Sequence, residues 1–426
     1  MIYHLLSILK SNASTILIAI LFIIGSIIAL GCKIPIKTVM DAYSYDVLII
    51  CIIMELFTNL ATATGFMQHL GIKIASVSKG KKRLCLILFG IMMFFVSCFL
   101  NNITAVMMIL PIVFVLLKTL DVDHKYICCF FATLLAISNS GGAASPIGDF
   151  PAILIMSSGV TSFLGYLTHA FPLFAITSVA LILMWGMQIK KEDDDGAIRQ
   201  LAIANLKSQY KNLEVQKDVL KILGTIFIAM LIAWSFIPQE KIPPEIIAVL
   251  GYVCAMAICS LKKIKIKWDM ELKSVLTIAS FLFFSQVISQ TGILTVIAIY
   301  LQNNIQNPKL LIMSIMVIVS LIAGIFSAGP AAAAMMPVMI ELCHGPFAAQ
   351  SDWIAVAYAA SICSGSSLFM WSATAGFLLS GKINSAAIED THGQTIIWGI
   401  RQYFKYGLMN FGAQLSIALL AVMIIL

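Results

Sequence analysis

Long apolar segments dominate the chain, and most of them have the length that crosses a lipid bilayer. They fall near residues 12–31, 46–65, 84–118, 127–158, 161–188, 218–236, 246–261, 275–300, 311–341, 353–380 and 406–425. A helix needs about 20 apolar residues to span the hydrocarbon core. The pattern therefore predicts an all-α polytopic membrane protein that has the lipid bilayer as its surroundings.

Four of these segments carry an interruption. Segments 84–118 and 311–341 are too long for one crossing, so each is either two full spans or one re-entrant hairpin. Segments 127–158 and 353–380 contain glycine- and serine-rich breaks. Broken backbone at membrane depth survives only inside protein or around a cavity, because its N–H and C=O groups need partners there. Such breaks are where secondary transporters place their binding sites.

The chain also resembles itself at an offset of about 226 residues. The shared landmarks are ATGF at 63–66 with QTGI at 290–293, MMILPI at 107–112 with AAMMPV at 333–338, and Ser-Gly at 140–141 with 364–365. We predict two inverted repeats, residues 1–188 and 237–426, each with a re-entrant hairpin and a broken transmembrane helix. Residues 189–236 would form a cytoplasmic linker plus the extra span that inverts the second repeat.

Composition and charge agree with a membrane protein and give it an orientation. The 426 residues are 60% hydrophobic and 11% charged, which excludes an ordinary soluble domain. The net charge of +7 concentrates in loops 70–83, 189–217, 262–267 and 382–405. The positive-inside rule places these loops in the cytoplasm. We therefore expect a multi-pass protein of the cell inner membrane, with a cytoplasmic N-terminus and an external C-terminus, rather than a protein that binds nucleic acid.

Sequence motifs of several enzyme classes are missing. The sequence has no G-x-x-x-x-G-K-[ST] motif, and no Ser/His/Asp arrangement stands out. The ten cysteines show no C-x-x-C pairing and the six histidines no H-x-x-x-H pair. We therefore expect no enzymatic activity, no cofactor and no metal beyond a transported ion.

Two acidic residues are predicted to bind a proton or cation. Asp149 lies in the first break, and Glu55 lies near the middle of the span 46–65. A carboxylate at bilayer depth costs roughly 3 kcal/mol, so it is usually retained for a function. For Glu55 a purely structural, hydrogen-bonded glutamate remains an alternative. Gln286 takes the place of Asn59 in the second half and Leu282 that of Glu55, so the halves are chemically unequal.

Polar and small residues at the tips and breaks are predicted to line the ion or substrate site. They are Asn101, Asn102 and Thr104 at the first tip, Ser140, Gly141, Gly142 and Ser145 in the first break, Ser327 at the second tip, and Ser364, Gly365, Ser366 and Ser367 in the second break. Two alternatives stay open. Either asparagine could simply cap the helix that follows, and small or hydroxyl residues are ordinary packing between membrane helices.

These motifs resemble the ion-transporter superfamily, which includes arsenite permeases, divalent-anion symporters and NhaD-type sodium/proton antiporters. FLNNITAVMMILPIV is similar to the asparagine-tipped hairpin of that group, and GGAASPIGD and SGSSLFMWSATAGF to its two breaks. The ending SPIGD looks most like the NhaD branch. Two positions depart from the pattern, since Asn101-Asn102 stands where NhaD proteins have Asp-Asn, and Ala328-Gly329-Pro330 replaces an asparagine tip. The resemblance implies an ion site around both breaks and a homodimer.

We therefore expect a secondary active transporter that works by alternating access on a small ion. Cation (sodium)/proton antiport, with Na+ and H+ as the transported ions, is the leading hypothesis. The alternative is a proton- or sodium-coupled permease for a small anion, either a carboxylate or an oxyanion. A transport subunit that needs a soluble ATPase and a membrane scaffold without transport activity are the other classes.

Overall fold

The computed structural model describes residues 13–425 with gaps at 42, 121, 190–195, 214, 240, 263–271, 294–295, 297–299, 301–303, 346, 374 and 392. Over these residues the regular structure is helical, apart from one isolated bridge between Glu389 and Thr395. The all-α class predicted from the sequence is therefore confirmed.

The described residues before position 210 form ten helices. They are α2 (Ala13–Gly31), α3 (Ile36–Asp41), α4 (Tyr45–Ala63), α5 (Phe66–Val77), α6 (Lys82–Ser97), α7 (Asn102–Thr119), α8 (His124–Ala143), α9 (Phe150–Ser157), α10 (Phe163–Gln188) and α11 (Gly196–Gln209). Helix α5 occupies much of the segment 70–83 that the sequence suggested as a loop.

The rest of the chain adds helices of similar length. They are α12 (Lys217–Phe236), α13 (Pro244–Leu261), α14 (Leu272–Gln290), α16 (Pro308–Phe326), α17 (Ala328–His344), the short 3-10 helix η1 (Ala348–Gln350), α18 (Ser351–Ser366), α19 (Gly376–Ser385) and α20 (Ile400–Ile425).

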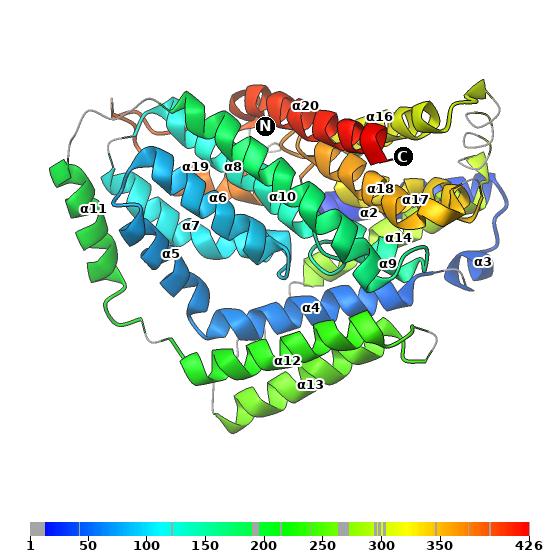
Figure 1. The fold of residues 1–426 in the computed structure, drawn as a ribbon, viewed down its shortest axis with the longest axis horizontal. Coiled ribbons are helices and arrows are strands. Elements are labelled where there is room, and N and C mark those ends of the chain that lie inside the picture. The colour runs from blue at the N-terminus through cyan, green and yellow to red at the C-terminus, as the bar shows by residue number, and fades with distance from the viewer. Residues whose placement is uncertain are drawn as a thin grey trace.

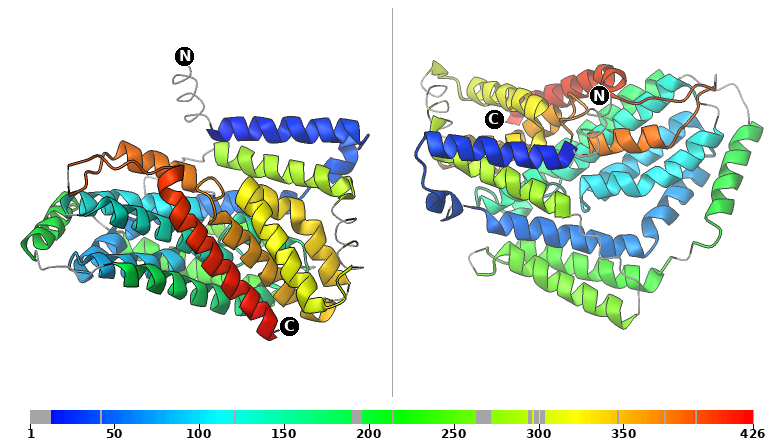
Figure 2. Two further views of the ribbon diagram at one scale, coloured as in Figure 1. Left: turned by 90° about the horizontal axis from the view of Figure 1, so that it is seen from above. Right: turned by 180° about the vertical axis from the view of Figure 1, so that it is seen from behind.

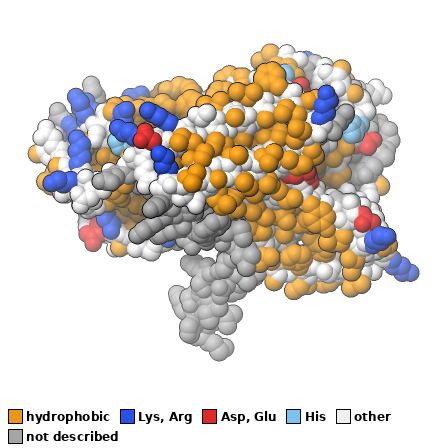
Figure 3. Space-filling model, turned by 90° about the horizontal axis from the view of Figure 1, so that it is seen from below, with side chains coloured by type: hydrophobic (Ala, Val, Ile, Leu, Met, Phe, Trp, Pro, Cys, Tyr) orange, Lys and Arg blue, Asp and Glu red, His pale blue; other side chains and the backbone are white. Residues whose placement is uncertain are grey.

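The described residues contain eight helices long and apolar enough to cross a membrane, namely α4, α7, α8, α10, α12, α13, α16 and α20. Their outer faces carry large exposed hydrophobic side chains, such as Ile228, Ile232 and Phe236 on α12. In Figure 3 hydrophobic side chains cover a broad belt of the surface, while lysines and arginines gather largely at one end. Such a surface is stable against lipid tails and not against water, so the chain is a polytopic membrane protein.

Two helices form the centre of the bundle. From Tyr126 to Ala143 every residue of α8 is buried, and α8 packs against α6, α7, α10, α18 and α20. From Ile354 to Ser366 every residue of α18 is also buried. These two helices end in the two glycine- and serine-rich breaks, so both breaks lie inside the protein (Figure 1).

The interruptions lie where the sequence indicated them. Segment 84–118 is divided between α6 and α7, and segment 311–341 is divided at Ser327, whose backbone has φ +86°. Segment 127–158 is divided between α8 and α9, and segment 353–380 between α18 and α19. Pro146 and Gly148 lie in the turn between α8 and α9, and Pro330 follows Ser327 in the first turn of α17, which explains why the helices stop at these two points.

Some outer helices pack against helices that are distant in the sequence. Helix α2 packs against α14, which lies side by side with it in both views of Figure 2. Helix α13 packs in turn against α4 and α12, and α12 and α13 lie along one edge of the molecule (Figure 1). The early helix α2 thus lies on a helix of the second half, and α13 lies on a helix of the first.

Candidate functional site

The two asparagines of the first tip, Asn101 and Asn102, have different roles. Asn101 caps α7, because its side-chain oxygen accepts a hydrogen bond of 2.9 Å from the backbone N–H of Ile103. Asn102 is the first residue of α7 and is fully buried. The cap predicted for one of the two residues therefore falls on Asn101, which leaves Asn102 free to point inward.

The Asn102 side chain joins two other polar groups of the first half. Its Nδ2 donates to Oδ1 of Asn139 and to Oδ2 of Asp149, each at 3.0 Å. Its Oδ1 is buried and accepts no hydrogen bond from any residue that the structure describes. An unpaired buried amide oxygen costs about 1–3 kcal/mol, so its natural partner is a donor or a cation.

Asp149 reaches this position because the chain turns sharply after α8. It caps α9, with Oδ1 accepting a hydrogen bond of 2.9 Å from the N–H of Phe150. A Cβ on Gly142 would lie 2.9 Å from the Cβ of Asp149, so the close approach requires glycine there. The partners of the carboxylate in this cluster are neutral, an amide and a backbone N–H.

The cluster extends into the second break. Asn139 Nδ2 donates to Oγ of Ser366 at 3.0 Å, and Ser366 donates to the carbonyl of Cys363 at 2.7 Å. One turn of α8 thus connects the first tip and first break to α18. We name Asn102, Asn139, Asp149 and Ser366 the amide–carboxylate cluster.

Other predicted residues of the first break stand beside this cluster. Ser140 donates to the Ala136 carbonyl at 3.1 Å, and its Oγ lies 3.8 Å from Sγ of Cys363. Ser145 donates to the carbonyl of Cys98, which ties the break to the end of α6. Ser145 also lines an apolar cavity of about 140 Å³ together with Phe99 and residues of α10 and α12. Thr104 lies within the first turn of α7.

The predicted residues of the second break serve mainly its own backbone. Ser364 donates to the Ser361 carbonyl at 2.9 Å, and Ser367 donates to the Cys363 carbonyl at 3.4 Å. A Cβ on Gly365 would lie 2.1 Å from the Ser320 carbonyl oxygen, so glycine permits the tight crossing with α16. Of the four residues expected here, Ser366 accepts a hydrogen bond from the first half, donated by Asn139.

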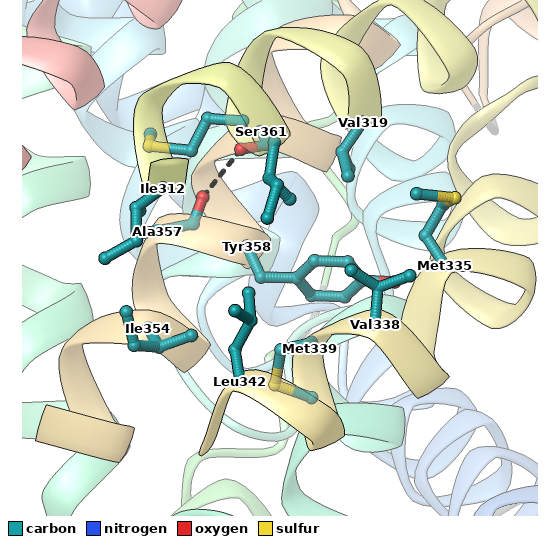
Figure 4. Close-up of a pocket in the computed structure, with 12 residues that line it drawn as sticks. Ile312, Val319, Met335, Val338, Met339, Leu342, Ile354, Ala357, Tyr358 and Ser361 are labelled. Carbon is teal, nitrogen blue, oxygen red and sulfur yellow. Dashed lines mark hydrogen bonds between the residues drawn. The ribbon is translucent and has the colours of Figure 1, made fainter. Parts of the chain in front are cut away.

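The polar groups of the second tip form hydrogen bonds with the second break. Ser327 Oγ and the N–H of Ala328 both donate to the carbonyl of Ser372, each at 3.1 Å. Ser372 in turn donates to the carbonyl of Gly324. Farther along the second hairpin, largely apolar side chains, Tyr358 among them, surround a cavity of about 20 Å³ (Figure 4). The Tyr358 hydroxyl donates a hydrogen bond to the Ala332 carbonyl.

Glu55 lies on the helix that flanks the cluster. Helix α4 packs against α9, the helix that Asp149 caps. The structure thus brings the two predicted acids to the same region of the protein.

Sequence reasoning missed Asn139 and Gln414. Asn139 immediately precedes the Ser-Gly pair at 140–141, but its face of α8 could not be fixed before the break was seen. Gln414 lies on α20, and its Nε2 donates to Oγ of Ser140 at 3.1 Å. A polar residue inside the last apolar segment was the available signal for Gln414.

Comparison with known proteins agrees with a transport role. The family model described as "Citrate transporter", CitMHS, matches residues 1–363. An uncharacterized transporter of Mycobacterium bovis is 23% identical over 79% of this chain and 78% of its own length. A 46 kDa membrane protein of Mycobacterium leprae is 23% identical over 70% of this chain and 68% of its own. The human P protein is 22% identical over 38% of this chain and 19% of its own length.

The family match covers the amide–carboxylate cluster almost completely, since Ser366 alone lies beyond it. It confirms the resemblance to the ion-transporter superfamily and supports a membrane transporter. The chain belongs to the CitMHS citrate transporter family.

Proposed function

We propose that this protein is a secondary active transporter of the inner membrane that couples a cation to the movement of a small carboxylate. The observation that carries the proposal is the buried pair of Asn102 Oδ1, which lacks a donor, and the Asp149 carboxylate beside it. An amide oxygen and a carboxylate are hard oxygen ligands that suit Na+ or a proton. Both sit where two broken helices meet, as in transporters that bind their coupling ion at the midplane.

The carboxylate substrate is supported by the family match and by nearby helix ends. The family model is that of citrate transporters. Helix α17 packs against α9, and α17 begins at the second tip. Helix N-termini carry partial positive charge and favour anions. A cation at Asp149 would reduce the repulsion between this carboxylate and an incoming anion, which couples the two binding events.

Cation/proton antiport is the second candidate, and the position of Glu55 favours it. Glu55 lies on α4, which packs against α9, the helix that Asp149 caps. Two neighbouring acids can exchange a proton for a sodium ion, because a bound cation stabilises the charged form that burial disfavours. In this case the second acid, and not a substrate anion, would take part in the exchange.

Alternating access would be provided by the two inverted repeats, 1–188 and 237–426, which we propose on the basis of matched contacts. Ser145 donates to the Cys98 carbonyl, and Ser372 donates to the Gly324 carbonyl, at an offset of about 226 residues. The concentration of lysines and arginines at one end supports the proposed orientation (Figure 3). The homodimer implied by the resemblance stays a prediction.

Transport by purified protein in proteoliposomes tests the proposal and separates the two candidates. With labelled citrate outside, uptake should rise with an inward sodium or proton gradient and vanish in Asp149→Asn. In vesicles without any carboxylate, sodium-driven proton movement reported by a pH-sensitive dye would instead support antiport. If wild-type protein responds to neither gradient, or if Asp149→Asn behaves like wild type, the proposal is wrong.

A further inference from the structure

Helix α20 carries two buried amides that face the centre of the bundle. It lies beyond the family match and packs against α8, α10, α16 and α18. Asn410 is fully buried and Gln414, one turn later, is 3% exposed. Uncharged amides are uncommon in a membrane helix unless they have partners or a function.

The two amides differ in what they leave unpaired. Asn410 Oδ1 accepts a hydrogen bond of 2.7 Å from Trp185 Nε1, and its Nδ2 donates to the Ala132 carbonyl at 3.3 Å. Gln414 Nε2 donates to Ser140 Oγ at 3.1 Å and to the Ala136 carbonyl at 3.4 Å. Its Oε1 is buried and accepts nothing from the residues that the structure describes. Asn410 is therefore explained by structure, whereas Gln414 is not.

The Gln414 side chain, which carries the unpaired oxygen, is connected to the amide–carboxylate cluster through Ser140. Ser140, which Gln414 holds, directly follows Asn139 of that cluster. Its hydroxyl lies 3.8 Å from Cys363 Sγ, and the Cys363 carbonyl accepts a hydrogen bond from Ser366 of the cluster. Asp149 belongs to the same cluster through its hydrogen bond with Asn102. The negative charge of Asp149 therefore reaches this neighbourhood, where it would favour a cation over an anion.

We propose that Gln414 Oε1 and Ser140 Oγ form a second station for the sodium ion beside the Asp149 site. The inference rests on the proposed cation site. Ser140 donates its proton to the Ala136 carbonyl and accepts a hydrogen bond from Gln414 Nε2, which leaves one lone pair of its hydroxyl oxygen for a cation. Amide and hydroxyl oxygens without a charge of their own bind sodium weakly, which suits transit to and from Asp149 more than storage.

Sodium binding by the purified full chain tests this station with isosteric variants. Gln414→Met removes the oxygen at constant size, Gln414→Glu keeps an oxygen there, and Asn410→Leu removes the neighbouring satisfied amide. Binding is measured with radioactive sodium and by thermal stabilisation in NaCl against choline chloride. We expect Gln414→Met to raise the half-saturating sodium concentration about fivefold or more, as on losing one uncharged ligand. Gln414→Glu should retain sodium binding, and Asn410→Leu should lower thermal stability without changing the half-saturating concentration.

Each result decides a different question. If Gln414→Met and Asn410→Leu both lose stability while their sodium response stays wild type, Gln414 is structural and the inference is wrong. If sodium binding disappears in Asp149→Asn while Gln414→Met keeps the wild-type half-saturating sodium concentration, the proposed function stands and the second station falls. If wild-type protein binds no sodium, the inference also fails, while a proton-coupled function through Asp149 survives provided that a pH gradient drives transport.

Discussion

The two helix breaks have parallel scaffolds and different chemistry. In the first half, Ser145 of the break donates a hydrogen bond to the Cys98 carbonyl, and Asn102 at the tip donates one to Asp149. In the second half, Ser372 donates a hydrogen bond to the Gly324 carbonyl. The Ser327 hydroxyl and the Ala328 N–H at the tip both donate to the carbonyl of Ser372.

This difference assigns different tasks to the two halves. A carboxylate and an unpaired amide oxygen need a ligand, whereas the Ser327 hydroxyl and the Ala328 N–H already donate to the Ser372 carbonyl. The first half would therefore bind the coupling cation. The second half would supply the framework that moves against it, together with Ser366, which reaches across to Asn139.

The largest effect that this comparison predicts is at Asp149. Asp149→Asn keeps the size and most hydrogen-bonding capacity of the side chain but removes its charge, so cation-coupled transport should be abolished. Asp352→Asn is the matched control in the second half, where Asp352 accepts a hydrogen bond of 2.6 Å from Thr161 and has no place in the cluster. Uptake per folded protein in proteoliposomes should remain within a few fold of wild type in the control. Equal losses in both variants would remove the distinction between the halves.

The next effect separates the adjacent residues Asn101 and Asn102. Asn102→Ala should raise the half-saturating cation concentration roughly 10- to 100-fold, because a hydrogen bond to a charged group contributes about 1.5–3 kcal/mol. Asn101→Ala removes a helix cap and should cost about 1 kcal/mol of stability with nearly normal cation affinity. Thermal unfolding in detergent and cation titration of transport, measured on both variants, check this. Reversed behaviour of the two residues would place the ligand at Asn101.

Much of this difference could be predicted from the sequence, because it depends on residue types that break helices. Gly148 and Pro151 predict the turn that carries Asp149, and the tip asparagines predict a polar hairpin. The sequence could not decide between Asn101 and Asn102, since both positions suit a cap. It also gave no reason to prefer Ser366 over Ser364, because a break resets the direction in which each side chain points.

Contacts between distant segments could not be predicted from the sequence. Gln414 meets Ser140 across 274 positions of the chain. No periodicity predicts which face of α20 turns toward α8, since both faces are largely apolar. The second tip shows the opposite case, where the lack of an asparagine in Ala328-Gly329-Pro330 already indicated a weaker site, and the structure shows how its donors are satisfied internally.

A smaller and symmetrical effect is expected at the two serines that close the breaks. Ser145→Ala and Ser372→Ala each remove one buried hydrogen bond to a helix-ending carbonyl, which should cost about 1–2 kcal/mol of stability. The two losses should agree closely if the breaks are equivalent by repeat. Thermal unfolding of both variants in the same detergent measures this. A loss confined to one serine would argue that the matched contacts are coincidental.

The smallest effect, and the one that tests the unequal chemistry most finely, is expected at Glu55. The proposed repeat places Leu282 at the equivalent position of the second half, so a glutamate is not needed to hold this kind of helix in place. Glu55→Gln removes a titrating group near Asp149 while preserving hydrogen bonding, and it should reduce the transport rate a few fold and flatten its dependence on pH. Initial rates across a pH series in proteoliposomes provide the measurement, with Asn59→Ala as a control one turn away on the same face. An unchanged pH profile in Glu55→Gln would make this residue structural and leave Asp149 as the proton carrier of the pair, which would weaken antiport and favour the carboxylate permease.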